Sequence, residues 1–372
     1  MLRTAVAGLS AALLLVATAC ASEADHTGAA TVSPTVSSTV ASTVAPTAAA
    51  TTPVTEPANT EPANTEPPTT QPTAATTPAA SGPLTIQELL DLRRPIVLAH
   101  AGGEDQHPHS TPYGYAESAR AGVDMLDFDV QLSHDGVLVV QHDDSTGRTA
   151  NADLVVADTD YADLAALDNA YWFTVACTCT DQPEAAYTLR GVRTGETPPP
   201  PGYTPDDFII PRFRDIANRF PDLPVNIEIK GTGAPALAAA TELAKELTEL
   251  DLLDNAVVTS FDDTVVDAFH ALAPSVEVTP GLALSSAWIL NGTPLPAGMR
   301  ILQLPPVYGD IDVLTAKSIS DSHAAGYVIW VWPNDRIWEN PDGYAKLLAM
   351  GLDGLNINVP DQGVQAVKAF SG

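Results

Sequence analysis

From residue 96 onward, short apolar runs alternate with longer helix-like stretches. Runs rich in Val, Ile and Leu predict eight strands, at residues 96–100, 125–130, 225–230, 256–261, 276–284, 300–304, 327–332 and 354–358. Helices are predicted between most of them, at 113–121, 212–219, 235–250, 264–272, 313–325, 343–350 and 362–370. Apolar strands that alternate with helices favour a parallel sheet covered by helices, and eight such units favour an α/β fold of the (β/α)8 TIM-barrel type.

Two segments of different composition precede this alternation. Residues 1–20 contain Arg3, an apolar stretch too short for the ~20 residues that span a bilayer, and small residues before Cys20. They predict a signal peptide with a lipobox-like end, and therefore an exported protein. We expect lipidation of Cys20 to anchor it on the extracytoplasmic face of the cell membrane. The alternative is secretion after ordinary cleavage near Ala19, because Ala17 stands where a lipobox usually has Leu.

Residues 21–81 are rich in Thr, Ala, Pro and Ser and have no helical or strand period, so they predict a disordered linker. Residues 82–372 are long enough for one large core and fit a single barrel domain. The pattern of that domain is interrupted at 170–207, between the second and third strands. This stretch predicts a surface insertion over one barrel rim, because it is too long for a plain connection.

The insertion contains Cys177 and Cys179, the two cysteines that remain when Cys20 is assigned to the anchor. A Cys-x-Cys metal site would need two further ligands, and none is spaced nearby as such sites require. We therefore favour a local disulfide in an oxidising compartment, and free thiols are the alternative.

Charged residues cluster at the ends of the second and third predicted strands. Asp127 and Asp129 are two residues apart, so they point the same way from a strand, and such close like charges are costly without a cation between them. With Glu228 from the next strand they supply three oxygen ligands suited to Mg²⁺ or Ca²⁺. The alternative is that the aspartates are solvated strand-end charges. Lys230 shares the face of Glu228, where it contacts a phosphate oxygen, forms a structural ion pair with Glu228 or Asp129, or does both.

The order and spacing of four motifs resemble the glycerophosphodiester phosphodiesterase family. These motifs are His100-Ala101-Gly102, Asp127-Phe128-Asp129, His142-Asp143 and Glu228-Ile229-Lys230. The resemblance covers about residues 96–360 and weakens after Lys230. It implies a barrel of the PLC-like phosphodiesterase type and metal-dependent hydrolysis of a glycerophosphodiester to sn-glycerol 3-phosphate and an alcohol.

Three side chains take their expected roles from this resemblance. His100 and His142 match the family's acid/base pair, in which one imidazole accepts a proton while the other donates one. The alternative for each is a hydrogen-bonded core histidine. Trp330 matches a late aromatic that lines the substrate pocket, and a core aromatic is its alternative. His107, His109 and His134 lack such support and are expected to be loop residues.

The chain also departs from the family pattern. Ala101 stands where the family has an arginine that contacts phosphate, Asp127 replaces a glutamate, and 109–111 reads His-Ser-Thr instead of Glu-Asn-Thr. Ile357-Asn358 replaces Thr-Asp. Loss of the arginine weakens charge stabilisation by roughly a few kcal/mol unless Lys230 or the Gly102-Gly103 backbone compensates.

The charge balance limits the possible partners. With 46 acidic and 17 basic residues the formal net charge is −29, which argues against nucleic-acid binding. Two other functions stay open beside hydrolysis of a small glycerophosphodiester. One is a related barrel phospholipase, sphingomyelinase D-like or phosphoinositide-cleaving, which an exposed apolar rim in the insertion would favour. The other is a non-catalytic surface-binding lipoprotein. The sequence does not define the leaving alcohol, the metal or the oligomeric state.

Overall fold

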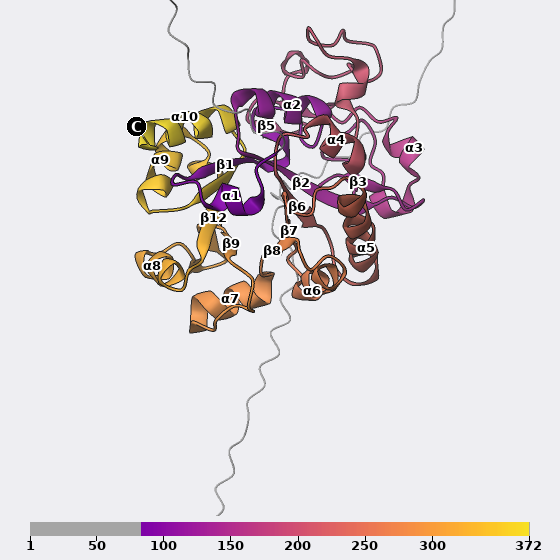
Figure 1. Cartoon of the computed structure of the whole chain (residues 1–372). Helices are drawn as coiled ribbons and strands as arrows, with labels where there is room; N and C mark the ends of the chain where they lie inside the picture. The colour runs from indigo at the N-terminus through magenta and orange to yellow at the C-terminus, as the bar shows by residue number, and fades with distance from the viewer. Residues whose placement is uncertain (1–82, 372) are drawn as a thin grey trace, which may run out of the picture. The chain divides into compact units, whose positions relative to one another are not determined.

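Eight parallel strands form a nearly closed barrel in the computed structural model, which describes residues 83–371 (Figure 1). Neighbouring strands follow the order β8-β7-β6-β2-β1-β13-β12-β9. Their bounds are β1 (Ile96–Ala99), β2 (Met125–Leu132), β6 (Val225–Ile229), β7 (Ala256–Thr259), β8 (Glu277–Val278), β9 (Ile301–Leu304), β12 (Val328–Val331) and β13 (Gly354–Ile357). The predicted barrel is confirmed, and a strand lies at each of the eight predicted places, although one is much shorter than expected. The predicted signal peptide, Cys20 and linker lie outside the described residues.

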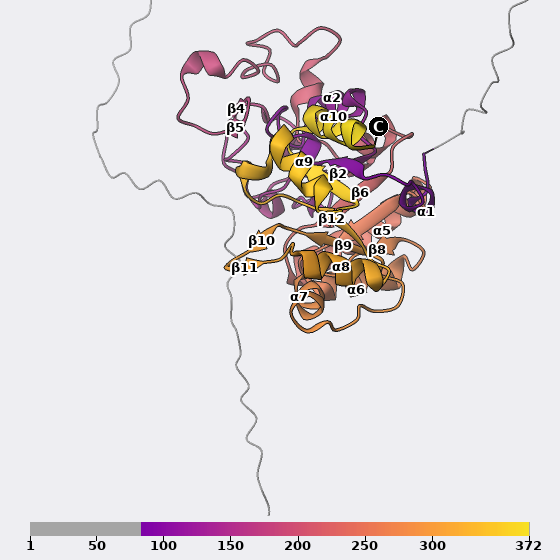
Figure 2. The same cartoon turned by 90° about the vertical axis from the view of Figure 1, so that its left-hand side faces the viewer.

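Helices surround this sheet in both views (Figures 1 and 2). They are α1 (Ile86–Leu90), α2 (Pro112–Ala121), α3 (Tyr161–Leu164), α4 (Phe213–Arg219), α5 (Gly233–Glu249), α6 (Asp263–Leu272), α7 (Leu282–Asn291), α8 (Ala316–Ala324), α9 (Pro341–Ala349) and α10 (Pro360–Ser371). Short 3-10 turns are η1 (His100–Gly102), η2 (Val156–Asp158), η3 (Glu184–Ala186), η4 (Pro205–Phe208) and η5 (Arg336–Trp338). No helix within residues 83–371 is long and apolar enough to cross a membrane.

One predicted element is wrong in its second half. The apolar run 276–284 was expected to be a single strand, but β8 covers only Glu277–Val278 and α7 already begins at Leu282. Pro280 and Gly281 separate the two elements, and a proline cannot donate a ladder hydrogen bond. An apolar run alone does not distinguish a strand from the start of a buried helix.

The two ends of the barrel are closed differently. At the amino ends of the strands, α1 packs Ile86 and Leu89 against an apolar cluster that includes Ile96 and Trp330. Figure 2 shows α1 on the opposite side of the sheet from two hairpins, β4–β5 (Phe173–Thr174 and Cys177–Thr178) and β10–β11 (Val307–Tyr308 and Ile311–Asp312). The carboxyl end therefore carries the long loops, and in this barrel class those loops build the active site.

The expected insertion lies between β2 and β6, and it follows β3 (Leu138–Val140), which pairs antiparallel with β2. It has an apolar core of its own, formed by Ala170, Val192 and Phe208. The predicted disulfide is confirmed, because Cys177 is bonded to Cys179 in the β4–β5 hairpin.

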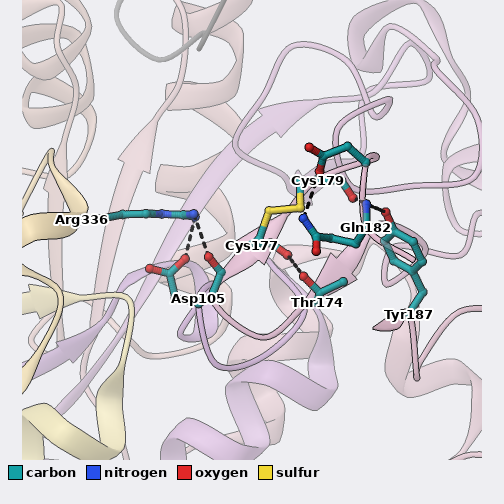
Figure 3. Close-up of a disulfide and its surroundings, with 9 residues drawn as sticks. Asp105, Thr174, Cys177, Cys179, Gln182, Tyr187 and Arg336 are labelled. Carbon is teal, nitrogen blue, oxygen red and sulfur yellow. Dashed lines mark hydrogen bonds and ion pairs between the residues drawn. A yellow bond between two sulfur atoms is a disulfide. The ribbon is translucent and has the colours of Figure 1, made fainter. Parts of the chain in front are cut away.

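Arg336 fastens that hairpin to the loop after β1 (Figure 3). Its guanidinium donates to the carbonyl oxygen of Ala176 and to the carboxylate of Asp105, each at 2.7 Å. The backbone amide of Ala176 also donates to the carbonyl of Asp105 at 2.6 Å. Segments far apart in sequence therefore meet beside the candidate site.

Candidate active site

A tight turn directly after β1 places His100 over the carboxyl end of the barrel. Gly102 and Gly103 both have left-handed backbone conformations, with φ values of 81° and 84°. A Cβ atom on Gly103 would lie 2.8 Å from the ring of Pro360, so only glycine fits this close approach. The turn brings Glu104 back beside the imidazole of His100, where Nδ1 and the carboxylate are 3.8 Å apart.

His100 is held by Asn358, the first residue after β13. The ring Nδ1 lies 2.8 Å from the amide oxygen of Asn358. Burial favours the neutral form of His100, but the nearby negative charges, first that of Glu104, outweigh burial and raise the pKa of His100 to about 9. His100 therefore carries a positive charge at neutral pH.

His142 faces His100 across the barrel end, with a ring-centroid distance of 6.3 Å. Its Nδ1 lies 2.6 Å from the carboxylate of Asp143, and Arg148 binds the same carboxylate through Nε at 2.5 Å and Nη2 at 3.3 Å. Asp143 therefore orients the imidazole and leaves Nε2 of His142 directed away from this contact. Burial disfavours the Asp143 carboxylate, but hydrogen bonds from His142 and Arg148 keep its pKa well below the usual range.

The carboxylates predicted as metal ligands come from adjacent strands in matching register. Asp129 is the partner of Glu228 in the β2–β6 ladder, and Asp127 is the partner of Asn226. The ammonium of Lys230 lies 2.9 Å from Glu228 and 3.5 Å from Asp129, so both structural ion pairs considered for this lysine are present. Asp127 accepts a 2.5 Å hydrogen bond from the side-chain amide of Asn226.

The predicted metal site at Asp127, Asp129 and Glu228 can be tested against the arrangement of these side chains. Within residues 83–371 no group of three or more His, Cys, Asp or Glu side chains is arranged to hold a metal ion. The donor chemistry does fit a hard cation, because three carboxylates share one end of the sheet and Oδ2 of Asp129 is buried without a hydrogen-bond partner. Lys230 neutralises Asp129 and Glu228 in this structure, so a divalent cation would compete with its ammonium.

The two neighbouring aspartates differ in their protonation chemistry. Burial raises the pKa of Asp127 to about 6. Burial also opposes ionisation of Asp129, but Lys230 and the surrounding histidines outweigh it and lower the pKa of that carboxyl. Asp129 is thus the permanent anion of the pair, as expected when like charges share one site.

His109 lies in a loop, as expected, but it also contributes to the site, a role that the sequence did not suggest. Its side chain is buried, and neither ring nitrogen has a hydrogen-bond partner. It contacts the site directly, because its Nε2 lies 3.6 Å from Glu104 and its ring centroid lies 5.8 Å from that of His142. Burial, followed by the positive charge of Arg148, lowers the pKa of His109 to about 3, so this imidazole is neutral at pH 7. Sequence reasoning missed it because no local pattern signals a buried loop.

Trp330, which was predicted to contact the substrate, lies in the core instead. Trp330 is only 1% exposed and packs in the apolar cluster with Leu98 and Met125, so it presents essentially no surface to a substrate. Trp332 lies at the end of the same strand, where its ring is 5.8 Å from that of Phe261. Ser110 and Thr111 are buried, and Thr111 caps α2. The side chain of Thr111 therefore serves the turn into α2, whereas the hydroxyl of Ser110 has no hydrogen-bond partner.

The fold and the site together define an α/β barrel with histidines, carboxylates and a lysine gathered at the carboxyl ends of its strands. Residues 100–362 match the model of the glycerophosphoryl diester phosphodiesterase family. The chain belongs to this family, and it is therefore an enzyme of the phosphoric diester hydrolase class.

Individual relatives and structures agree with this assignment. The chain is 25% identical over 267 residues to a putative glycerophosphodiester phosphodiesterase of Bacillus subtilis, which covers 71% of this chain and 95% of the relative. It is 23% identical over 278 residues to a glycerophosphodiester phosphodiesterase of Caldanaerobacter subterraneus, which covers 73% and 98%. An Oleispira antarctica phosphodiesterase in complex with the product sn-glycerol-3-phosphate has a similar fold, with a TM-score of 0.55, 20% identity, and coverage of 74% of this chain and 97% of the other.

Proposed function

We propose that this enzyme hydrolyses a glycerophosphodiester to sn-glycerol 3-phosphate and an alcohol, with His100 and His142 as the proton-transfer pair. The observation that supports the proposal most directly is the pair of imidazoles that face one another 6.3 Å apart over the barrel end. Each has its Nδ1 engaged by a different partner, Asn358 or Asp143, and this difference supports a different role for each ring.

The surroundings assign one role to each imidazole. His142, oriented by the Asp143 carboxylate, accepts the proton of the attacking hydroxyl group on its Nε2. His100, charged at neutral pH because of Glu104 and the other nearby carboxylates, donates a proton to the oxygen of the leaving alcohol. The attacking oxygen forms one P–O bond while the P–O bond to the leaving alcohol breaks, so His142 takes up one proton as His100 releases another. Where the attacking hydroxyl belongs to the glycerol of the substrate, water then opens the cyclic phosphate to sn-glycerol 3-phosphate, with the two imidazoles in exchanged roles.

A divalent metal ion, Mg²⁺ or Ca²⁺, belongs to this proposal. Members of the family generally depend on such an ion, and Asp127, Asp129 and Glu228 would hold it here. When bound, the ion supplies positive charge for a non-bridging phosphate oxygen. Lys230, which now pairs with Asp129 and Glu228, would then be available to the phosphate and would replace part of the charge lost because Ala101 stands where the family has an arginine.

Arg148 is a second source of compensating charge. Its guanidinium lies 3.5 Å from Glu104 and also holds Asp143, so it brings a permanent cation close to both histidines. Its Nε and Nη2 are bound by Asp143 and its Nη1 by Glu104, so it supplies positive charge near the site and holds both carboxylates in place.

A substrate panel tests the proposed function. The full chain is assayed with glycerophosphocholine, glycerophosphoethanolamine and bis(p-nitrophenyl) phosphate, each with Mg²⁺, with Ca²⁺ and with chelator. Release of sn-glycerol 3-phosphate in a metal-dependent manner supports the proposal. Turnover of the synthetic diester alone, without turnover of either glycerophosphodiester, contradicts the substrate assignment.

A lipid substrate is the second candidate, and one feature of the surface favours it. Val175 at the tip of the β4–β5 hairpin is 78% exposed, and Ile337 in η5 is 69% exposed. Arg336 links these two segments through its hydrogen bond to Ala176. Two apolar side chains therefore project near the loop that contains Glu104. A rate that rises sharply above the critical micelle concentration of a lysophospholipid would favour this candidate over the water-soluble substrate.

We also propose that the protein is exported and anchored in the cell membrane by a lipid on Cys20. The support is the sequence before Cys20, where a short apolar stretch and small residues precede the cysteine. A protein with one or two acyl chains associates with a bilayer without a spanning helix.

A further inference from the structure

Asn358 is engaged at every polar group it has. Its backbone amide donates to Glu339 at 3.0 Å, and its carbonyl accepts from the amide of Asp105 at 3.2 Å. Its side-chain oxygen faces Nδ1 of His100 at 2.8 Å, and its side-chain nitrogen faces Glu104 at 3.1 Å. The residue is buried, so these contacts rather than water determine the direction in which its amide points.

The two carboxylates near the amide nitrogen fix the orientation of the amide. Ionised carboxylates only accept hydrogen bonds, and Asn358 Nδ2 lies 3.1 Å from Glu104 and 3.4 Å from Asp105. The opposite orientation would direct the amide oxygen at two carboxylates and the amide nitrogen at His100. The oxygen of Asn358 must therefore face His100.

This orientation decides which nitrogen of His100 holds a permanent hydrogen. An amide oxygen only accepts, so Nδ1 of His100 must donate and must carry the hydrogen in both charge states. The proton that enters and leaves the ring is then the one on Nε2. A ring that lost its proton from Nδ1 instead would deliver it to Asn358 and away from the reacting groups.

We propose that Asn358 is a positioning residue, oriented by Glu104, that confines the transferable proton of His100 to Nε2. The inference rests on the proposed acid role of His100 and extends it to residues outside the family's matching motifs. Position 358 is asparagine where the family resemblance gives aspartate. The two ends of an amide differ, so an asparagine needs a partner such as Glu104 to fix which atom faces His100.

The direct test needs no substitution. Nitrogen-15 NMR of the wild-type protein, with histidine labelled and the His100 signals assigned by comparison with His100→Gln, reports the tautomer of the neutral ring at a pH above its pKa. The expected result is a protonated Nδ1 and an unprotonated Nε2. A neutral ring protonated on Nε2 overturns the inference, whether or not turnover has been detected. A correct tautomer in a protein that hydrolyses no glycerophosphodiester would leave this inference standing and reject the proposed function.

Substitutions then connect the tautomer to catalysis. Asn358→Leu removes the acceptor, and loss of such an orienting partner typically costs about 10- to 100-fold. We expect that loss in kcat with KM little changed and a mixed tautomer in the spectrum. Glu104→Gln leaves only the longer contact with Asp105 to orient the Asn358 amide, so we expect the tautomer to shift toward protonated Nε2. Asn358→Asp keeps an acceptor opposite Nδ1 and should recover most of the kcat that Asn358→Leu loses.

Asn255→Leu is the matched control. Asn255 is buried to a similar degree and its side chain donates to the carbonyl of Leu84 at 2.8 Å, next to the amino end of β7. Its substitution removes one buried amide far from His100, so it should lower the melting temperature without changing the tautomer or kcat. Equal losses of kcat in Asn255→Leu and Asn358→Leu, with the wild-type tautomer kept in both, would reduce Asn358 to a structural residue.

Discussion

The ammonium of Lys230 lies 2.9 Å from the carboxylate of Glu228 and 3.5 Å from that of Asp129. A divalent cation held by these carboxylates would compete with the lysine for the same negative charges. Because the two cations differ in charge and in affinity, such competition would be measurable.

The first prediction concerns the metal. Mg²⁺ or Ca²⁺ should raise the melting temperature of the wild type, because a ligand that binds only the folded state stabilises it by about 2.7 kcal/mol at one hundred times its dissociation constant. Glu228→Gln should abolish this effect and chelator should abolish turnover. Lys230→Met should bind metal more tightly, since the competing ammonium is gone.

Differential scanning calorimetry with and without metal makes these measurements. Glu242→Gln is the control, because Glu242 pairs with Lys245 at 2.7 Å on the outer helix α5 and should leave the metal effect unchanged. Full metal stabilisation in Glu228→Gln would move the metal site elsewhere in the chain.

The second prediction concerns the proton-transfer pair. His100→Ala and His142→Ala should each lower kcat by ~10²–10⁴, the usual contribution of a general acid or base, while the barrel stays folded. The double variant should be little slower than either single one, because both groups act in one step. Steady-state kinetics with circular dichroism as the folding check decides this. Near-normal kcat in both single variants would make the histidines structural.

The third prediction is a pH dependence. His100 donates a proton only when charged, so kcat should fall as the pH rises through about 9, the raised pKa of this residue. The same shift adds stability that is fully present below the ordinary histidine pKa of about 6.5 and is lost as the pH rises through about 9. Rate and melting profiles against pH test both effects. His100→Gln should remove the alkaline loss of stability, and a wild-type rate that stays flat through about pH 9 contradicts the acid role.

The fourth prediction is a loss of stability at acidic rather than alkaline pH, and it concerns His109. His109 is neutral when folded, with a pKa lowered to about 3, but it takes up a proton when unfolded. Its contribution to stability is present above about pH 6.5 and is lost as the pH falls toward about 3. His109→Phe should therefore lose less melting temperature than the wild type on acidification. His134→Phe, a substitution at an exposed histidine paired with Asp160, should not reduce the acid loss; if it does so equally, the buried site is not responsible.

The fifth prediction concerns anchoring. Cys20→Ser should move the protein from the membrane fraction to the soluble fraction, because it removes the proposed lipid attachment site. The barrel should keep its melting temperature, since the substitution lies far from it in sequence. Immunoblots of separated fractions measure the effect, and unchanged partitioning argues against lipidation.

Much of the barrel could be predicted because its strands are buried on both faces. Buried parallel strands read as continuous apolar runs, so the strands that carry Asp129 and Glu228 were visible without any tertiary information. The start of α7 was not, since Leu282 and its neighbours are as apolar as a strand and only Pro280 and Gly281 mark the change. The pattern of apolar residues locates buried segments, but it does not reliably distinguish a short strand from the start of a buried helix.

The residues of the site could be predicted only where a reactive side chain directly follows an apolar strand. Asp129, Glu228 and His100 follow apolar runs, whereas Glu104 and His109 lie in a loop whose path depends on Gly103 meeting Pro360 from the far end of the chain. Trp330 is the opposite case, a residue predicted for the site that lies in the core. An aromatic residue in a strand points either to the core or to the substrate, and the alternation of side chains along a strand decides which.

The Cys177–Cys179 bond encloses a single residue, so the chain-entropy model gives it little influence on the unfolded state. The bond closes only the turn after Ala176, the residue whose backbone amide donates to Asp105. The barrel therefore gains little stability from loop closure by this crosslink, and reduction should alter the hairpin beside the turn after β1 while the melting temperature of the barrel stays nearly unchanged.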